Sequence, residues 1–176
     1  RLVGSEMCIR DRDGADETWP VTIGKDYLYG VAKGASEHVA LAAHAAREID
    51  VTIIRPGDVY GPGSRAWLIE PLKMAKAGQL ILPDNGDGVF TPVFIEDLLD
   101  GIMLAAGLEE GAGQVFILWG GETVSCNEFF SHNWRWAGRS GAPRSLPLKA
   151  ALALTKGVWR VDQLLKRHDE VTPDTM

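Results

Sequence analysis

Residues 51–63 read VTIIRPGDVYGPG, and this stretch decides the fold that the sequence predicts. Residues 51–54 form a continuous β-branched run, which favours a strand buried on both faces of a parallel sheet. Residues 55–63 are rich in glycine and proline and indicate a loop at the carboxyl end of that strand. In open α/β sheets, ligands bind beyond the carboxyl ends of the strands. We therefore expect the functional site at the loop that begins at Pro56.

Helical and strand patterns alternate on both sides of this stretch. Residues 28–48 carry apolar side chains at three- and four-residue steps, which is typical of an amphipathic helix. Residues 114–119, QVFILW, predict a second buried strand. This order is half of a βαβ series and predicts an α/β fold. Further helices are expected over 67–77, 96–107, 125–136 and 148–165, and short strands over 80–82 and 89–94.

Composition excludes several classes of function. A formal net charge of -6 argues against binding to nucleic acid or to an anionic membrane, and no apolar run is long enough to cross a bilayer. Cys8 and Cys126 form no metal-binding pattern, and His38 and His44 are not spaced as metal ligands. We therefore expect no metal site, and a reducing, cytoplasmic setting.

The first predicted helix carries a candidate pair for acid/base chemistry. Tyr29 and Lys33 are four residues apart, so both side chains project from one face of the helix. A lysine ammonium held near a phenol favours the phenolate and lowers the pKa of the phenol, which can then exchange a proton with an alcohol or ketone oxygen. The same spacing also occurs on solvated helix faces, so the surrounding motifs must decide its role.

Those motifs, taken in order, resemble the extended short-chain dehydrogenase/reductases, the NAD-dependent epimerase/dehydratase family. Residues 29–33 (YGVAK) match the YxxxK helix of that family, and residues 55–62 (RPGDVYGP) match its RPxxVYGP loop. Residues 93–99 (VFIEDLL) match a later segment with an aspartate, Asp97, four residues after a valine. The resemblance covers about residues 17–138.

The resemblance implies a role for each matching residue. Tyr29 would be the catalytic acid/base, and Lys33 would hydrogen-bond the nicotinamide ribose while it polarises Tyr29. Asp58 would also touch the substrate. Four loop residues would line the nicotinamide end of the cofactor, NAD or NADP: Pro56, Gly57, Asp58 and Val59. The alternative interpretation of this loop is a stiff turn that only ends a strand.

The resemblance implies that the α/β fold is the C-terminal half of a doubly wound parallel, Rossmann-like sheet with a small substrate-binding lobe. It also implies domain boundaries. Residues 13–125 would be the C-terminal part of an NAD(P)-binding domain, with 80–93 contributing to the substrate lobe. Residues 126–176 would form the mostly helical remainder of that lobe. Residues 1–12 show no periodicity, and we interpret them as a non-native or artefactual tail, with a genuine polar loop as the alternative. In both cases we interpret the chain as truncated.

The implied function is that of an NAD(P)-dependent oxidoreductase, epimerase or dehydratase that transfers hydride. The small-molecule substrate would be a nucleotide-sugar, or a ketone or alcohol of the 3β-hydroxysteroid or flavonoid-reductase kind, and the parent protein could be a homodimer. No G-x-x-G-x-x-G phosphate loop occurs in the sequence. Two alternatives therefore stay open: an inert fragment, or a non-catalytic member of the fold that binds a nucleotide or a protein.

Overall fold

The computed structural model describes residues 16–18, 28–151 and 153, and the chain divides into two compact units. The first unit includes Val3–Glu70 and Val89–Val124, and the second includes Pro71–Gly88 and Ser125–Met176. The predicted tail lies outside the described residues. So does most of the helix predicted over 148–165, of which residues 148–151 and 153 are described and helical.

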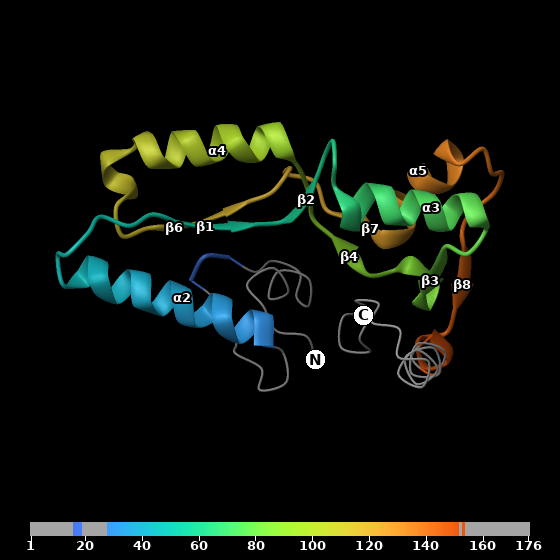
Figure 1. Ribbon diagram of the computed structural model, residues 1–176, viewed down its shortest axis with the longest axis horizontal. Coiled ribbons are helices and arrows are strands. Elements are labelled where there is room, and N and C mark those ends of the chain that lie inside the picture. The colour runs from blue at the N-terminus through green and yellow to red at the C-terminus, as the bar shows by residue number, and fades with distance from the viewer. Residues whose placement is uncertain (1–15, 19–27, 152, 154–176) are drawn as a thin grey trace. The chain divides into compact units, whose positions relative to one another are not determined.

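Two parallel strands form the centre of the first unit, β1 (Ile53–Pro56) and β6 (Val115–Leu118). Helices α2 (Leu28–Ala45) and α4 (Ile95–Gly107) lie on opposite sides of this strand pair (Figure 1). Helices on both faces of a parallel pair are the arrangement that a continuously β-branched strand requires. The predicted α/β class is confirmed.

A second parallel pair continues the path of the first. Strand β2 (Asp58–Tyr60) pairs with β5 (Pro92–Phe94), so the chain changes its partner strand at Gly57. The rings of Tyr60 and Phe94 meet edge to face, with their centroids 5.5 Å apart. The loop predicted to begin at Pro56 is therefore in part a strand.

Helix α2 ends three residues earlier than its periodicity predicts. Arg47 adopts a left-handed conformation with φ of 60°, and the Glu48 amide donates to the Ala43 carbonyl oxygen at 3.0 Å. A left-handed residue that returns hydrogen bonds to the last turn is a common helix end. The apolar pattern continues past this point, which is why the sequence suggested a longer helix.

Strand β1 begins two residues later than predicted and extends to Pro56. The side chain of Thr52 donates to the Gly111 carbonyl oxygen at 2.9 Å, and the Val51 carbonyl oxygen accepts from the Gly113 amide. These residues therefore hold the loop before β6 instead of pairing with the strand itself.

The helix predicted over 67–77 is two elements, a π-helical turn η1 (Arg65–Ile69) and α3 (Glu70–Ala77). Pro71 is the second residue of α3 and has no amide hydrogen to donate to the preceding turn. A proline at this place explains why the backbone widens into a π turn before regular helix begins.

The second unit contains a parallel pair that the sequence did not predict. Strand β3 (Ile81–Pro83) pairs with β8 (Arg144–Leu146), and α5 (Cys126–Trp136) begins where the Ser125 hydroxyl accepts from the Glu128 amide at 3.0 Å. The buried core of the second unit includes Ala75, Leu80 and Trp134.

The remaining short elements of the chain are η2 (Asp84–Gly86), β4 (Val89–Phe90), η3 (Glu109–Gly111) and β7 (Val124–Ser125). Of the helices described here, none has the length and apolar character to cross a membrane.

Candidate functional site

The carboxyl edge of the β1–β6 pair is closed tightly around Gly57. The Gly57 amide donates to the Leu118 carbonyl oxygen at 2.8 Å, and the next amide, of Asp58, donates to the Thr91 carbonyl oxygen at 2.8 Å. A Cβ on Gly57 would lie 2.4 Å from that Thr91 oxygen. The chain can change partner strands here because this position carries no side chain.

Asp58 is buried at the same edge, with 4% of its surface exposed. Its carboxylate oxygen Oδ2 accepts a hydrogen bond from the Thr91 amide at 3.1 Å. This contact, together with the backbone bond in the opposite direction, fixes the start of β2 against the start of β5. The carboxylate therefore has a structural role, and its contact with a substrate stays a prediction.

An ion pair links helix α2 to strand β1. Arg55 and Glu37 form a two-point contact, with Nε of Arg55 3.2 Å from one carboxylate oxygen and a terminal guanidinium nitrogen bonded to the other. Each side chain is only 10% exposed. The Glu17 carbonyl oxygen also accepts from Arg55, and the Glu17 carboxylate accepts from the amide of Ile117 on β6. This arrangement ties four segments of the first unit together: the segment that holds Glu17, helix α2, and strands β1 and β6.

The ion pair also determines how far along β1 the predicted catalytic pair, Tyr29 and Lys33, lies. Helix α2 runs opposite to β1 (Figure 1), and one helical turn advances about as far as two residues of a strand, roughly 6 Å. Counting back from Glu37 therefore places Lys33 level with Gly57, two residues after Arg55. A further turn places Tyr29 beyond the carboxyl end of β1.

Tyr29 and Lys33 contact each other. The Lys33 ammonium nitrogen lies 5.5 Å from the centroid of the Tyr29 ring, within the range of a cation–π interaction. The Tyr29 side chain is 44% exposed, and Lys33 is exposed as well. The structure thus joins the two predicted catalytic residues on one helical face, near the end of β1 that holds Pro56–Val59. The roles of these residues in catalysis and cofactor binding stay predictions.

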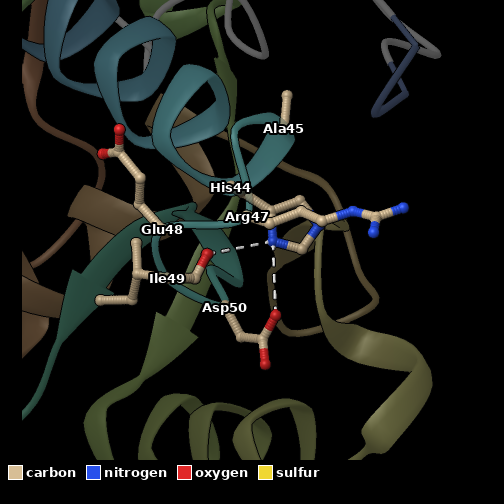
Figure 2. A pocket seen from close by; sticks show the side chains of 6 residues that line it. All are labelled: His44, Ala45, Arg47, Glu48, Ile49 and Asp50. Atoms are coloured by element: carbon tan, nitrogen blue, oxygen red, sulfur yellow. Dashed lines mark hydrogen bonds and ion pairs between the residues drawn. The ribbon is translucent and has the colours of Figure 1, made fainter.

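A hollow of about 740 Å³ lies at the other end of α2 (Figure 2). It is lined by residues 44, 45 and 47–50, whose side chains include both charge signs. The His44 ring nitrogen Nδ1 is 3.3 Å from the Ile49 carbonyl oxygen and 3.7 Å from the Asp50 carboxylate. These residues precede β1, so the hollow is at the amino edge of the strands, opposite the edge where such sheets bind ligands. We therefore do not assign it to the active site.

Arg139, in the second unit, is used for structure. Its guanidinium donates to the carbonyl oxygens of Ala75 and Lys76 at the end of α3 and lies 5.1 Å from the Trp134 ring. A cation that satisfies the last carbonyl groups of a helix stabilises that helix end. Among the residues that the structure describes, no group of three His, Cys, Asp or Glu side chains could hold a metal ion.

Sequence reasoning missed two features of this edge. It did not pair Glu37 with Arg55, although Glu37 stands one turn after Lys33 on the same helix. It also did not single out Trp119, which directly follows β6 and is 40% exposed. The signal for Trp119 was available, because it ends the apolar run 114–119 at a predicted carboxyl edge.

Known proteins share this part of the chain. The sequence profile of the NAD dependent epimerase/dehydratase family matches residues 6–118. Sterol-4-alpha-carboxylate 3-dehydrogenase (decarboxylating) of Candida albicans is 30% identical over 99 residues, which are 55% of this chain and 28% of that protein. UDP-glucose 4-epimerase of Vibrio cholerae is 31% identical over 102 residues, 57% of this chain and 31% of that protein. The chain thus spans about a third of the length of these two relatives.

Solved structures share the fold. The dTDP-glucose 4,6-dehydratase of Streptomyces venezuelae, solved with NAD bound, superposes with a TM-score of 0.66 at 23% identity. The match covers 83% of this chain and 46% of that one. The UDP-glucose 4-epimerase of Thermus thermophilus, also solved with NAD, gives a TM-score of 0.61 at 21% identity, over 77% of this chain and 45% of that one.

Proposed function

The chain belongs to the NAD-dependent epimerase/dehydratase family, and from this premise we propose that its parent protein is an NAD(P)-dependent oxidoreductase, epimerase or dehydratase that transfers hydride. One observation carries the proposal to particular residues. The Lys33 ammonium contacts the Tyr29 ring on a helix that the Glu37–Arg55 ion pair holds at the carboxyl edge of β1. The place of this exposed pair, at the edge where such sheets bind ligands, supports a role in catalysis.

The residues present fit one end of a dinucleotide. An exposed ammonium and an exposed phenol can donate hydrogen bonds to ribose hydroxyl groups, and Lys33 and Tyr29 supply them side by side. Bound NAD or NADP would supply the centre that accepts or donates hydride. The phosphate-binding glycine loop is not in this sequence, so we assign that contact to another part of the parent protein.

Within this proposal Tyr29 moves the proton. Its phenolate takes a proton from an alcohol oxygen, or its neutral hydroxyl group gives one to a ketone oxygen, while the hydride moves. The positive charge of Lys33 stabilises the phenolate that forms when Tyr29 has given its proton away. Lys33 also holds the ribose, so it orients the reacting groups as well as stabilising charge.

Two substrate classes follow from the two curated relatives. One is named as a sterol dehydrogenase and the other as a UDP-glucose epimerase, so the substrate is a ring alcohol or ketone, or a nucleotide-sugar. An inert fragment is the second candidate, and the missing phosphate loop favours it, whereas the Tyr29 and Lys33 pair argues against a non-catalytic nucleotide- or protein-binding role. The homodimer and the cytoplasmic location belong to the proposal as predictions.

The test uses the complete parent protein and follows nicotinamide absorbance. Tyr29→Phe removes the proton transfer and keeps the ring, so turnover should fall about 10²- to 10⁴-fold with little change in cofactor affinity. Lys33→Ala should lower turnover and cofactor affinity together, and should move the pH–rate profile to higher pH. Tyr27→Phe, two residues before Tyr29 and outside the described residues, is the control. A Tyr29→Phe variant with wild-type turnover would refute the assignment.

A further inference from the structure

An exposed indole stands beside the glycine at the carboxyl edge. Trp119 follows the last residue of β6 and has 40% of its surface exposed. Its Cβ lies 3.2 Å from the point where a Cβ on Gly57 would stand, and the Thr91 side chain lies at 3.3 Å from the same point. The backbone around it is fixed, because the Gly120 amide donates to the Pro92 carbonyl oxygen at 2.9 Å.

The indole is on the same face of the strands as helix α2. Leu118 points to the opposite face, where its Cδ1 would lie 2.9 Å from a Cβ on Gly101 of α4. Side chains alternate between the faces of an extended chain, so Trp119 projects toward the α2 face. Arg55, which contacts Glu37 of α2, is two residues before Gly57 and defines that face on β1.

Of the charged side chains described beside Gly57, Arg55 and Asp58 are engaged within the protein, and Lys33 is assigned to the cofactor ribose under the proposed function. Arg55 is bound by the Glu37 carboxylate and the Glu17 carbonyl oxygen, and the Asp58 carboxylate accepts from the Thr91 amide. Recognition of a diphosphate depends on cations that are free to make charge-assisted hydrogen bonds. Beside Gly57, the edge instead offers an indole next to a glycine backbone.

We propose that Trp119 contacts the substrate, laying its indole against an apolar ring of a secondary alcohol or ketone whose oxygen faces Tyr29. This inference rests on the proposed function and narrows its two substrate classes to the ring alcohol. Large flat aromatic side chains bind ring systems by burying apolar area and by stacking. An apolar ring covers the exposed indole, whereas the diphosphate of a nucleotide-sugar would compete for Arg55 and Lys33, which already have partners in this arrangement.

The kinetic test uses the complete protein with three alcohols: cyclohexanol, dehydroepiandrosterone and UDP-glucose. Trp119→Ala should raise KM for the productive ring alcohol roughly tenfold to hundredfold and leave kcat and the KM of the cofactor nearly unchanged. Trp119→Phe keeps a flat ring and should restore most of the affinity. The matched control is Trp136→Ala, because Trp136 is a more exposed indole, at 62%, on α5 of the second unit.

A binding measurement separates this inference from the proposed function. Equilibrium dialysis of dehydroepiandrosterone should show the same tenfold to hundredfold loss of affinity in Trp119→Ala, with Trp119→Phe close to wild type. If no alcohol yields hydride transfer but this pattern is found, the proposed function fails and the Trp119 contact stands. Equal affinity in all three proteins, or productive turnover of UDP-glucose that Trp119→Ala does not change, would overturn the contact.

Discussion

The two ends of helix α2 differ in what they offer a ligand. The N-terminal end carries Tyr29 and Lys33, exposed and in contact, beside the glycine edge of β1. The C-terminal end carries His44 beside a hollow of about 740 Å³ with mixed charge. This hollow is therefore at the end that lacks the acid/base pair. In this fold, the edge of the sheet at which a residue lies is a better guide to its function than the volume of a hollow beside it.

The polar contacts in the middle of α2 and at its C-terminal end also differ in burial. In the middle of α2, Glu37 meets Arg55 with both side chains 10% exposed, and this contact sets the position of the catalytic end. At the C-terminal end, His44 approaches the Asp50 carboxylate at 3.7 Å, and Asp50 is 90% exposed. Water screens the second contact far more than the first. The helix is thus anchored from its middle, and its C-terminal end adds little.

The largest effect is expected when the Glu37–Arg55 ion pair, which anchors α2, is removed. Glu37→Ala leaves the Arg55 guanidinium buried without its carboxylate, which should lower the free energy of unfolding by about 3–5 kcal/mol. Denaturant unfolding of the complete protein measures the change. The control is Glu70→Ala, because Glu70 meets Arg65 at 3.5 Å where the two side chains are 42% and 77% exposed. That variant should lose about 0–1 kcal/mol.

If Glu37→Ala lowers the free energy of unfolding no more than Glu70→Ala does, the Glu37–Arg55 ion pair does not anchor α2. The position of Lys33 level with Gly57 would then no longer be fixed by this ion pair. Replacing both partners, with Glu37→Met and Arg55→Met, should recover part of the stability, because no charge is left unpaired in the interior. Such recovery would show that the loss came from an uncompensated charge.

Most of the described helices and strands were predictable, because each follows from a local pattern in the sequence. The period of the apolar residues predicted α2, and the β-branched run predicted β1. Ser125 predicted the start of α5, where its hydroxyl accepts from the Glu128 amide. The errors were also local in origin. Strand β8 has three residues and no alternation, and the break before α3 depends on how one proline meets the preceding turn.

The contacts that build the site could not be predicted in the same way. Glu37 and Arg55 are 18 residues apart, and Glu17 and Ile117 are 100 apart. No periodicity relates such pairs, because they meet only when helix and strand are packed together. The motifs nevertheless identified Tyr29 and Lys33, whose contact lies within one helical turn. The sequence thus carried the local pair, and the structure added the residues that position it.

A smaller effect is expected at the glycine that the edge requires. Gly57→Ala puts a Cβ 2.4 Å from the Thr91 carbonyl oxygen, so the backbone at Gly57 and the backbone before β5 must separate. Overpacking of this kind typically costs about 1–3 kcal/mol, which denaturant unfolding can measure. The control is Gly107→Ala, at the end of α4, where a Cβ meets nothing within 4 Å. Equal stability of the two variants would mean that the edge is not closely packed.

The smallest effect is expected at the opposite end of α2, and it tests the comparison most directly. His44→Ala removes a ring nitrogen that is 3.3 Å from the Ile49 carbonyl oxygen and 3.7 Å from a highly exposed carboxylate. A contact of this kind contributes about 0–1 kcal/mol, so the melting temperature of the complete protein should change by only a few degrees. Turnover and cofactor affinity should equal those of the wild type, because His44 lies at the amino edge of the strands. If His44→Ala instead lowered turnover as far as Tyr29→Phe does, with its fold intact by melting, ligand would have to reach the hollow beside His44. The active site could then no longer be assigned to the carboxyl edge of the strands.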